Sequence, residues 1–162
     1  MYGSTLYTFK RSFIEQLQGR TSNVAYESPM DASDVMGDDG SGATVYWDDT
    51  VNGSVSQVVF TGPNQHWFDE QYTLKLVIQV LGSDTSADQM SVDDRATQIL
   101  GEAIALLSTD PTGGVADTTE FALLNAHPSG WQSTSGVLAQ HIRAVKYVVD
   151  VEVDARIILE ST

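Results

Sequence analysis

Three histidines, His66, His127 and His141, are the residues whose type best suits zinc binding or general-base catalysis. A zinc site needs several ligands that converge on one point, and a general base needs a partner that orients it. The three histidines lie in separate segments, at spacings that match no metal motif. We therefore expect them to be loop or surface residues and predict no metal site.

Acidic residues could bind calcium or form a pair of catalytic carboxylates. Asp34, Asp38 and Asp39 are clustered, but their spacing lacks the alternate-position ligands and terminal Glu of an EF-hand loop. Adjacent acids such as Asp69 and Glu70 point to opposite faces of a strand, so they cannot easily act together. The sequence also lacks cysteine, a Gly-x-Ser-x-Gly elbow and a glycine-rich nucleotide-binding loop. We predict that the protein is not an enzyme and has no catalytic residue and no cofactor.

Four aromatic residues are better candidates for function. Trp47, Trp67, Phe68 and Trp131 lie in or beside segments expected to be loops. Aromatic side chains in such places often anchor an interface once a partner buries them. We therefore predict these four as interface residues; the alternative is that they close the ends of the core.

The charge balance is strongly acidic. Twenty-two acids and eight bases give a net charge of −14 and a pI near 4.2. This excludes an extensive basic surface for gripping nucleic-acid phosphates. Acids spread along the whole chain favour a halophilic surface, which stays soluble when molar salt screens the repulsion. A local role, such as repelling DNA inside a channel, is compatible with that interpretation.

Two segments have the periodicity of amphipathic helices. The first is 6–17, where apolar residues recur every three or four positions and Gly19 is a plausible end. The second follows Ser91, which precedes Asp94 by three residues as in a capping box, and continues to Thr109. Its predicted apolar face is Val92, Ala96, Ile99, Leu100, Ala103, Ile104 and Leu107.

The remaining regular segments predict β-structure. Residues 44–47 and 55–60 flank the turn signal Asn52-Gly53, which predicts a hairpin. Residues 68–81 alternate between apolar and polar side chains, as a strand with one buried face does. Residues 119–126 predict a further strand, and the Ser-, Gly- and Pro-rich stretch 125–136 predicts a loop. Apolar and polar residues alternate almost without interruption over 141–157, a strand of roughly 50 Å that must bend or project beyond the domain.

These elements predict one α+β domain over residues 1–162, with a mainly antiparallel sheet, two helices on one face and long hairpin or loop extensions. Residues 28–42 are predicted to form an acidic irregular loop or arm. No run of about 18 apolar residues occurs, so we expect no membrane span.

The order and local character of these elements resemble the lambda-like tail terminator family of long non-contractile-tailed viruses. The resemblance covers nearly the whole chain. It rests on the segments 13–17 (FIEQL), 70–80 (EQYTLKLVIQV), 93–96 (DDRA), 110–114 (DPTGG) and 147–156 (YVVDVEVDAR). The acidity adds the expectation of a halophilic, for example haloarchaeal, host.

The resemblance implies a hexameric ring in the virion, assembled in the host cytoplasm. Such a ring caps the tail tube, ends its polymerisation and meets a neck or head-completion protein on its other side. DNA passes through the lumen without specific binding. Two alternatives stay open: another virion ring protein, such as a neck connector, stopper or tail-tube subunit, and a small-molecule-binding α+β domain of a halophile. The last would have a concave pocket with converging polar groups.

Overall fold

A single antiparallel sheet with two helices makes up the described part of the computed structural model, which covers residues 4–28, 41–62, 65–83, 88–139 and 141–160. The elements follow the order α1 (Leu6–Gln18), β1 (Ser41–Trp47), β2 (Asn52–Gly62), β3 (Gln65–Ser83), α2 (Gln89–Thr109), β4 (Phe121–Ala139) and β5 (Ile142–Glu160). This confirms the α+β prediction. Most of the predicted acidic arm, residues 29–40, lies outside the described residues.

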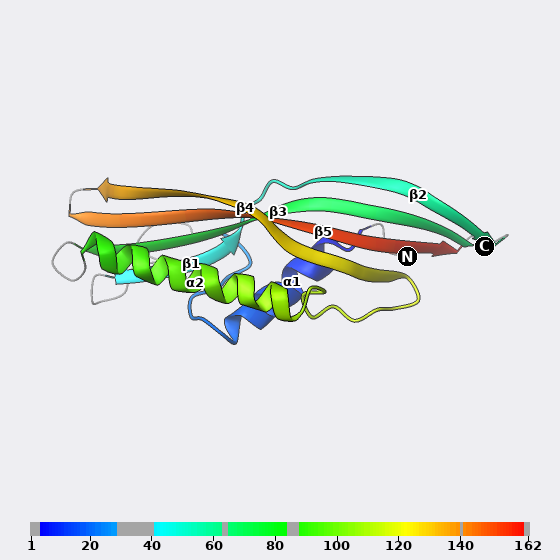
Figure 1. Ribbon diagram of the computed structural model, residues 1–162, viewed down its shortest axis with the longest axis horizontal. Helices are drawn as coiled ribbons and strands as arrows, with labels where there is room; N and C mark the ends of the chain where they lie inside the picture. The colour runs from blue at the N-terminus through cyan, green and yellow to red at the C-terminus, as the bar shows by residue number, and fades with distance from the viewer. Residues whose placement is uncertain (1–3, 29–40, 63–64, 84–87, 140, 161–162) are drawn as a thin grey trace.

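The two helices lie on the same side of the sheet (Figure 1). α1 buries Phe9, Phe13, Ile14 and Leu17 and ends at Gly19, as its periodicity predicts. α2 begins two residues before Ser91, because Asp88 is the N-cap and accepts a hydrogen bond from the backbone N–H of Ser91 at 2.8 Å. The predicted cap at Ser91 is therefore wrong. The buried face of α2 includes Leu106, whereas Ile104 is only half-buried.

The central strands β3 and β5 pair along their whole length. Nineteen successive residues face each other, from Gln65 opposite Glu160 to Ser83 opposite Ile142, without a bulge. A strand of 19 residues spans roughly 60 Å. The strands extend past both helices at the end where β5 stops (Figure 1). The long strand is predicted either to bend or to project beyond the domain, and in the structure it projects.

Except for Tyr147, which is only half-buried, the residues of the predicted alternation are the apolar residues buried on the helix side of β3 and β5. They are Tyr72, Leu74, Leu76, Ile78 and Val80 on β3, and Val145, Val149, Val151, Val153, Ala155 and Ile157 on β5. We call the opposite side, which the helices do not cover, the open face. It carries the charged residues of these two strands that alternate with the buried set, such as Lys75 and Asp150.

The predicted hairpin between residues 44–47 and 55–60 is wrong. β1 pairs with Leu76–Gly82 of β3 and β2 pairs with Gln65–Thr73, so the two strands lie end to end along the same edge of β3. Asn52 and Gly53 begin β2 instead of forming a turn. A Cβ at Gly53 would lie 3.2 Å from both the carbonyl oxygen of Gln71 and the Cβ of Tyr72. The backbone of β2 approaches β3 so closely here that a side chain would be crowded, which explains the glycine at position 53.

The predicted loop at 125–136 is also wrong, because β4 continues through it to Ala139 beside β5. Register shifts occur at three places, one of them between Pro128 and Gly130. β4 is an edge strand, where a missing proline N–H or a bulge disturbs only one ladder. Composition typical of a loop is therefore compatible with a strand here.

Candidate assembly interface

The four aromatic residues predicted as interface anchors do not form one patch. Trp131 lies opposite Val149 of β5, and Trp67 lies opposite Ile158. Nine residues of an extended strand separate these two levels by about 30 Å. Each aromatic residue therefore has to be judged by its own surroundings.

Trp47 belongs to the core and cannot meet a partner. Its side chain is 1% exposed, and its ring packs at 5.3 Å and 6.3 Å, between centroids, from Phe13 and Phe9. Its indole N–H donates a 3.0 Å hydrogen bond to the carbonyl oxygen of Lys10. The prediction of Trp47 as an interface residue is therefore wrong, because α1 covers the end of β1.

Trp67 and Phe68 are adjacent on β3 and both are half-buried. The guanidinium of Arg156 lies 4.9 Å from the centre of the Trp67 ring. The Nε of Arg156 also donates to the Asp69 carboxylate at 3.0 Å, so the cation is fixed over the ring. Much of the Trp67 surface thus already has a partner within the chain.

Trp131 is the exposed member of the set. Its side chain is 60% exposed, and its ring meets Tyr147 edge-on, with centroids 5.5 Å apart. The Tyr147 hydroxyl lies 3.3 Å from that of Thr97 on α2. An exposed aromatic ring supported in this way can bind a partner with little loss of side-chain freedom.

The charged residues of the sheet lie only on its central strands. β1, β2 and β4 contain no Asp, Glu, Lys or Arg. β3 and β5 contain all ten of the sheet's charged residues, listed as Asp69, Glu70, Lys75, Arg143, Lys146, Asp150, Glu152, Asp154, Arg156 and Glu160. Soluble proteins usually protect edge strands with charge, so this distribution is the reverse of the usual one. The sequence prediction does not include this distribution, because it assigns only 119–126 of this region to a strand and 125–136 to a loop.

The edge that β1 offers is already covered. The backbone N–H of Ala25 donates to the carbonyl of Val45 at 2.8 Å, and that of Val45 donates to Asn23 at 3.1 Å. In the described part of the chain, no strand lies against the outer edge of β2 or β4. We call these two the free edges. Both expose apolar side chains, with Val55 of β2 57% exposed and Val137 of β4 65% exposed.

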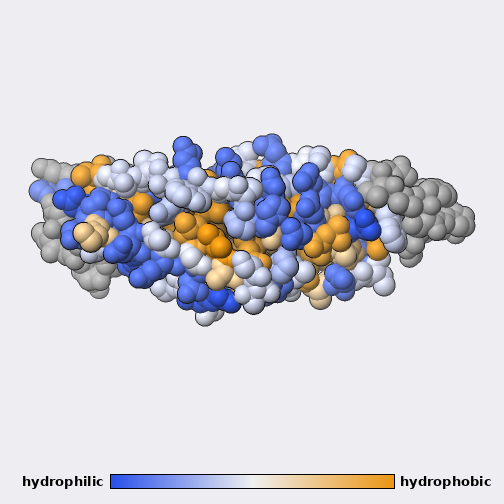
Figure 2. Space-filling model, in the orientation of Figure 1, coloured by the Kyte–Doolittle hydropathy of each residue, from blue (hydrophilic) through white to orange (hydrophobic). Residues whose placement is uncertain are grey.

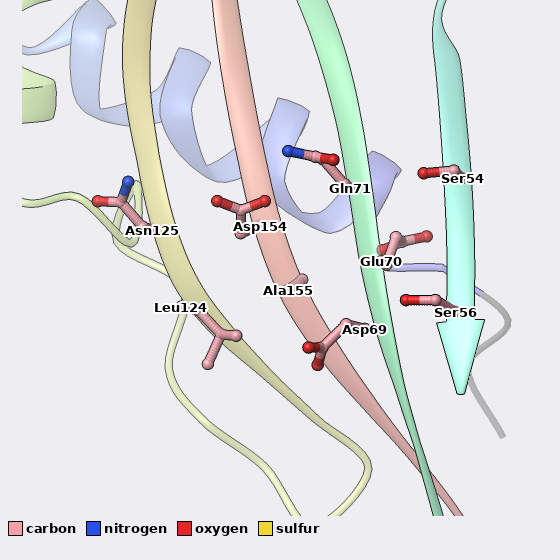
Figure 3. Close-up of a pocket in the computed structure, with 9 residues that line it drawn as sticks. All are labelled: Ser54, Ser56, Asp69, Glu70, Gln71, Leu124, Asn125, Asp154 and Ala155. Atoms are coloured by element: carbon pink, nitrogen blue, oxygen red, sulfur yellow. The ribbon is translucent and has the colours of Figure 1, made fainter. Parts of the chain in front are cut away.

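The open face between the free edges is polar and nearly balanced in charge. Lys75 lies directly opposite Asp150, and Asp69 lies opposite Arg156, so opposite charges form cross-strand pairs. A hollow of about 400 Å³ crosses the sheet here (Figure 3). Its lining comes from β2, β3, β5 and β4 and consists of Ser54, Ser56, Asp69, Glu70, Gln71, Leu124, Asn125, Asp154 and Ala155.

Glu70 differs from the other carboxylates of this hollow, because its side chain is buried and bonded to Thr5.

Of the predicted surface histidines, His127 forms a half-exposed pair with Glu152, whose Oε2 lies 3.2 Å from its Nε2. Among the residues that the structure describes, no group of three or more His, Cys, Asp or Glu is placed to hold a metal ion. No helix in the same ranges is long and apolar enough to cross a bilayer.

One face of the molecule displays apolar residues along its middle, with hydrophilic residues around them (Figure 2). In a chain of net charge −14, apolar residues that remain exposed are candidates for contact with a partner.

Comparison of the sequence with protein-family models and with curated proteins finds no match.

Proposed function

We propose that this chain is a structural protein of a virion and acts as the tail terminator of a long-tailed virus. Six copies form a ring that caps the tail tube, ends its polymerisation and joins the tail to a neck or head-completion protein. The virion context rests on the resemblance in element order. The self-assembly rests on the two free edges of the sheet.

The free edges carry the proposal because they lack the usual protection against pairing. Exposed strand edges present rows of unpaired N–H and C=O groups, and charged side chains are a common means of keeping them apart. This chain has 30 charged residues and places none of them on β2 or β4. Such edges favour pairing with another strand of matching character.

Two different free edges on one subunit favour a ring. A contact between unlike surfaces repeats from copy to copy, and it closes when the rotation between neighbours divides a full turn. The hollow across the open face gives less support to a small-molecule site. It runs over four strands of the sheet between the two free edges, in the region that neighbouring copies would extend.

Passage of DNA through such a ring requires that its wall does not bind phosphates. The open face supplies Asp69, Asp150, Glu152 and Asp154 together with Lys75, Lys146 and Arg156. Acids and bases that pair across strands leave no basic stripe for a phosphate backbone. This composition suits a lumen that DNA crosses without specific contacts.

The test is native mass measurement in molar salt together with imaging of the particles. We expect closed hexameric rings that do not lengthen as the protein concentration rises, and that cap tail tubes of the same virus. Open tubes would identify a tail-tube subunit instead. Rings that leave tail tubes free to grow would favour a connector or stopper. A monomer at every concentration would contradict all virion-ring assignments.

A further inference from the structure

We infer that β4 of one copy pairs with β2 of the next copy, antiparallel, so that the sheet continues from subunit to subunit. This inference rests on the proposed self-assembly and adds which edges meet, in which direction and at which level. The occupant of each free edge is a second copy of this chain.

The strand directions at the two free edges suit this pairing. The sheet is antiparallel throughout, with the order β2, β3, β5, β4 at the end where β2 lies. Four strands in alternating directions leave β2 and β4 running opposite ways. Copies related by rotation about an axis along the strands keep their directions. β4 of one copy then meets β2 of the next in the same antiparallel arrangement as inside the subunit.

The outer edges of β2 and β4 are also both available for pairing. Val45 of β1 accepts a hydrogen bond from the Ala25 N–H and donates one to the Asn23 carbonyl, so the outer edge of β1 is occupied and β2 is the free edge on that side. β2 provides 11 residues and β4 provides 19, with no charge on either. Pairing therefore brings no charged residue of one edge strand against a charged residue of the other.

The register across the sheet aligns polar residues of the two free edges. Ser54 lies opposite Gln71, Gln71 opposite Asp154, and Asp154 opposite Asn125, so Ser54 and Asn125 occupy one level on the two free edges. Figure 3 shows this polar row crossing the four strands. An unstaggered junction places Asn125 beside Ser54 of the next copy, which joins two polar side chains on the open face.

The same junction also brings exposed apolar residues of the two free edges close to one level. Val55 lies opposite Glu70, Glu70 opposite Ala155, and Ala155 opposite Leu123, which directly precedes Leu124. Val55 is 57% exposed and Leu124 is 46% exposed. An unstaggered junction therefore brings Val55 to the level of Leu123, one residue away from the exposed Leu124. A stagger of two residues would keep the same faces together but change the partners.

Cysteine cross-linking tests the junction directly, because the natural sequence has no cysteine. Paired positions on antiparallel strands have Cα separations of about 4.5–5.5 Å, within the range that a disulfide spans. We combine Ser54→Cys with Asn125→Cys, and in separate chains with Ala122→Cys or His127→Cys to cover a stagger of two to three residues. Each single variant is a control.

Oxidation of assembled protein in molar salt should give a ladder of covalent oligomers from one of the double variants, ending at the ring's subunit number. The single variants should stay monomeric on a denaturing gel. Dimers from Asn125→Cys alone would indicate β4 paired with β4 about a twofold axis and would overturn the inference. Rings confirmed by mass, without cross-links in any double variant, would overturn it while leaving the proposed function intact. Absence of any assembly in the natural chain would overturn both.

Leu124→Lys provides a second measurement that needs no oxidation. A lysine in the junction should raise the protein concentration at half-assembly by at least about tenfold, because a desolvated charge opposes pairing. The control is Ala105→Lys, which adds the same charge on an exposed position of α2. Equal effects of the two substitutions, or no effect of Leu124→Lys, would contradict a junction at this level.

Discussion

The carboxylate of Glu70 accepts two hydrogen bonds from Thr5, one from its backbone N–H at 2.9 Å and one from its hydroxyl at 2.7 Å. Thr5 is the N-cap of α1 and makes no capping bond with its own side chain. The Tyr72 hydroxyl lies 3.0 Å from the same Thr5 oxygen. A side chain of β3 thus places a negative charge at the helix N-terminus, where the helix dipole favours it. This contact fixes where α1 begins on the sheet.

Glu70→Ala should therefore destabilise the fold. It leaves the Thr5 N–H and hydroxyl buried without their acceptor, which costs about 1–3 kcal/mol in the free energy of unfolding. Urea titration in molar salt measures the difference. Gln71→Ala, at the exposed neighbouring position, should change the free energy of unfolding by less than about 0.5 kcal/mol. Equal effects of the two substitutions would show that the contact is not stabilising.

Trp47 and Trp131 should respond in opposite ways. Trp47→Ala removes a buried ring and should cost about 3–5 kcal/mol in the free energy of unfolding. Trp131→Ala removes an exposed ring and should cost less than about 1.5 kcal/mol, the contribution of its contact with Tyr147. If Trp131 anchors a partner, its loss should weaken assembly while the subunit stays folded. Chemical unfolding and native mass measurement separate the two effects.

The regular elements of the fold could be predicted because their apolar residues repeat with a fixed period. In α1 and in the two central strands, the spacing of apolar residues alone predicts most of the residues that form the core of the structure. Only the first part of β4 could be predicted, as the strand over 119–126, because Pro128 and Gly130 are typical of loops and conceal its continuation beside β5. Composition does not reveal that an edge position tolerates both residues.

The candidate interface was predictable only in part. Both Trp47 and Trp131 are predicted interface residues, and the packing of α1 against β1 distinguishes the buried ring from the exposed one. The absence of charge on the free edges is visible in the sequence. Its meaning depends on the strand order, because the same uncharged segments would be unremarkable in the centre of a sheet.

Asp110 should make stability depend on pH in the acid range. Its Oδ1 accepts hydrogen bonds from the Thr112 hydroxyl at 2.6 Å and from the Thr112 N–H at 3.1 Å. These bonds, led by that from the hydroxyl, hold the pKa of Asp110 below its ordinary value of 3.8. The folded state therefore favours the charged form. The stabilisation is fully present above pH 3.8 and is lost as the pH falls through the lowered pKa.

Comparison with Asp110→Asn isolates this contribution. The difference in free energy of unfolding between the natural chain and the variant should be constant near neutral pH and should shrink below pH 3.8. Denaturant titrations across this range measure it. A difference that grows on acidification would contradict the assigned direction of the pKa shift.

High salt should stabilise the protein. At a net charge of −14, carboxylate repulsion opposes the compact state, and ions shorten the range of that repulsion from about 10 Å at 0.1 M to about 3 Å at 1 M. The thermal midpoint should rise between 0.1 M and molar potassium chloride. Chloride is preferred to sulfate because sulfate strengthens apolar burial in any protein. An unchanged midpoint would contradict the halophilic interpretation.

Gly113 and Gly101 should give opposite results when replaced by alanine. Gly113 has φ +62°, and an added Cβ would lie 2.5 Å from the ring of Phe9, which is fully buried. Gly113→Ala should therefore cost more than about 1 kcal/mol in the free energy of unfolding. Gly101 lies within α2, and an added Cβ would meet nothing within 4 Å. Gly101→Ala should stabilise the fold by about 0.5–1 kcal/mol, because alanine loses less backbone freedom in a helix.

Ser12 and Gly113 together test how α1 is held against the turn after α2. Ser12 donates a 2.7 Å hydrogen bond to the carbonyl oxygen of Gly113, so a shift of this turn would disturb both the Phe9 contact and that bond. Ser12→Ala should then lose most of its effect in the Gly113→Ala background, because the two substitutions disturb the same contact. Additive losses in urea titrations of the two single variants and the double variant would show that the turn and α1 are not coupled.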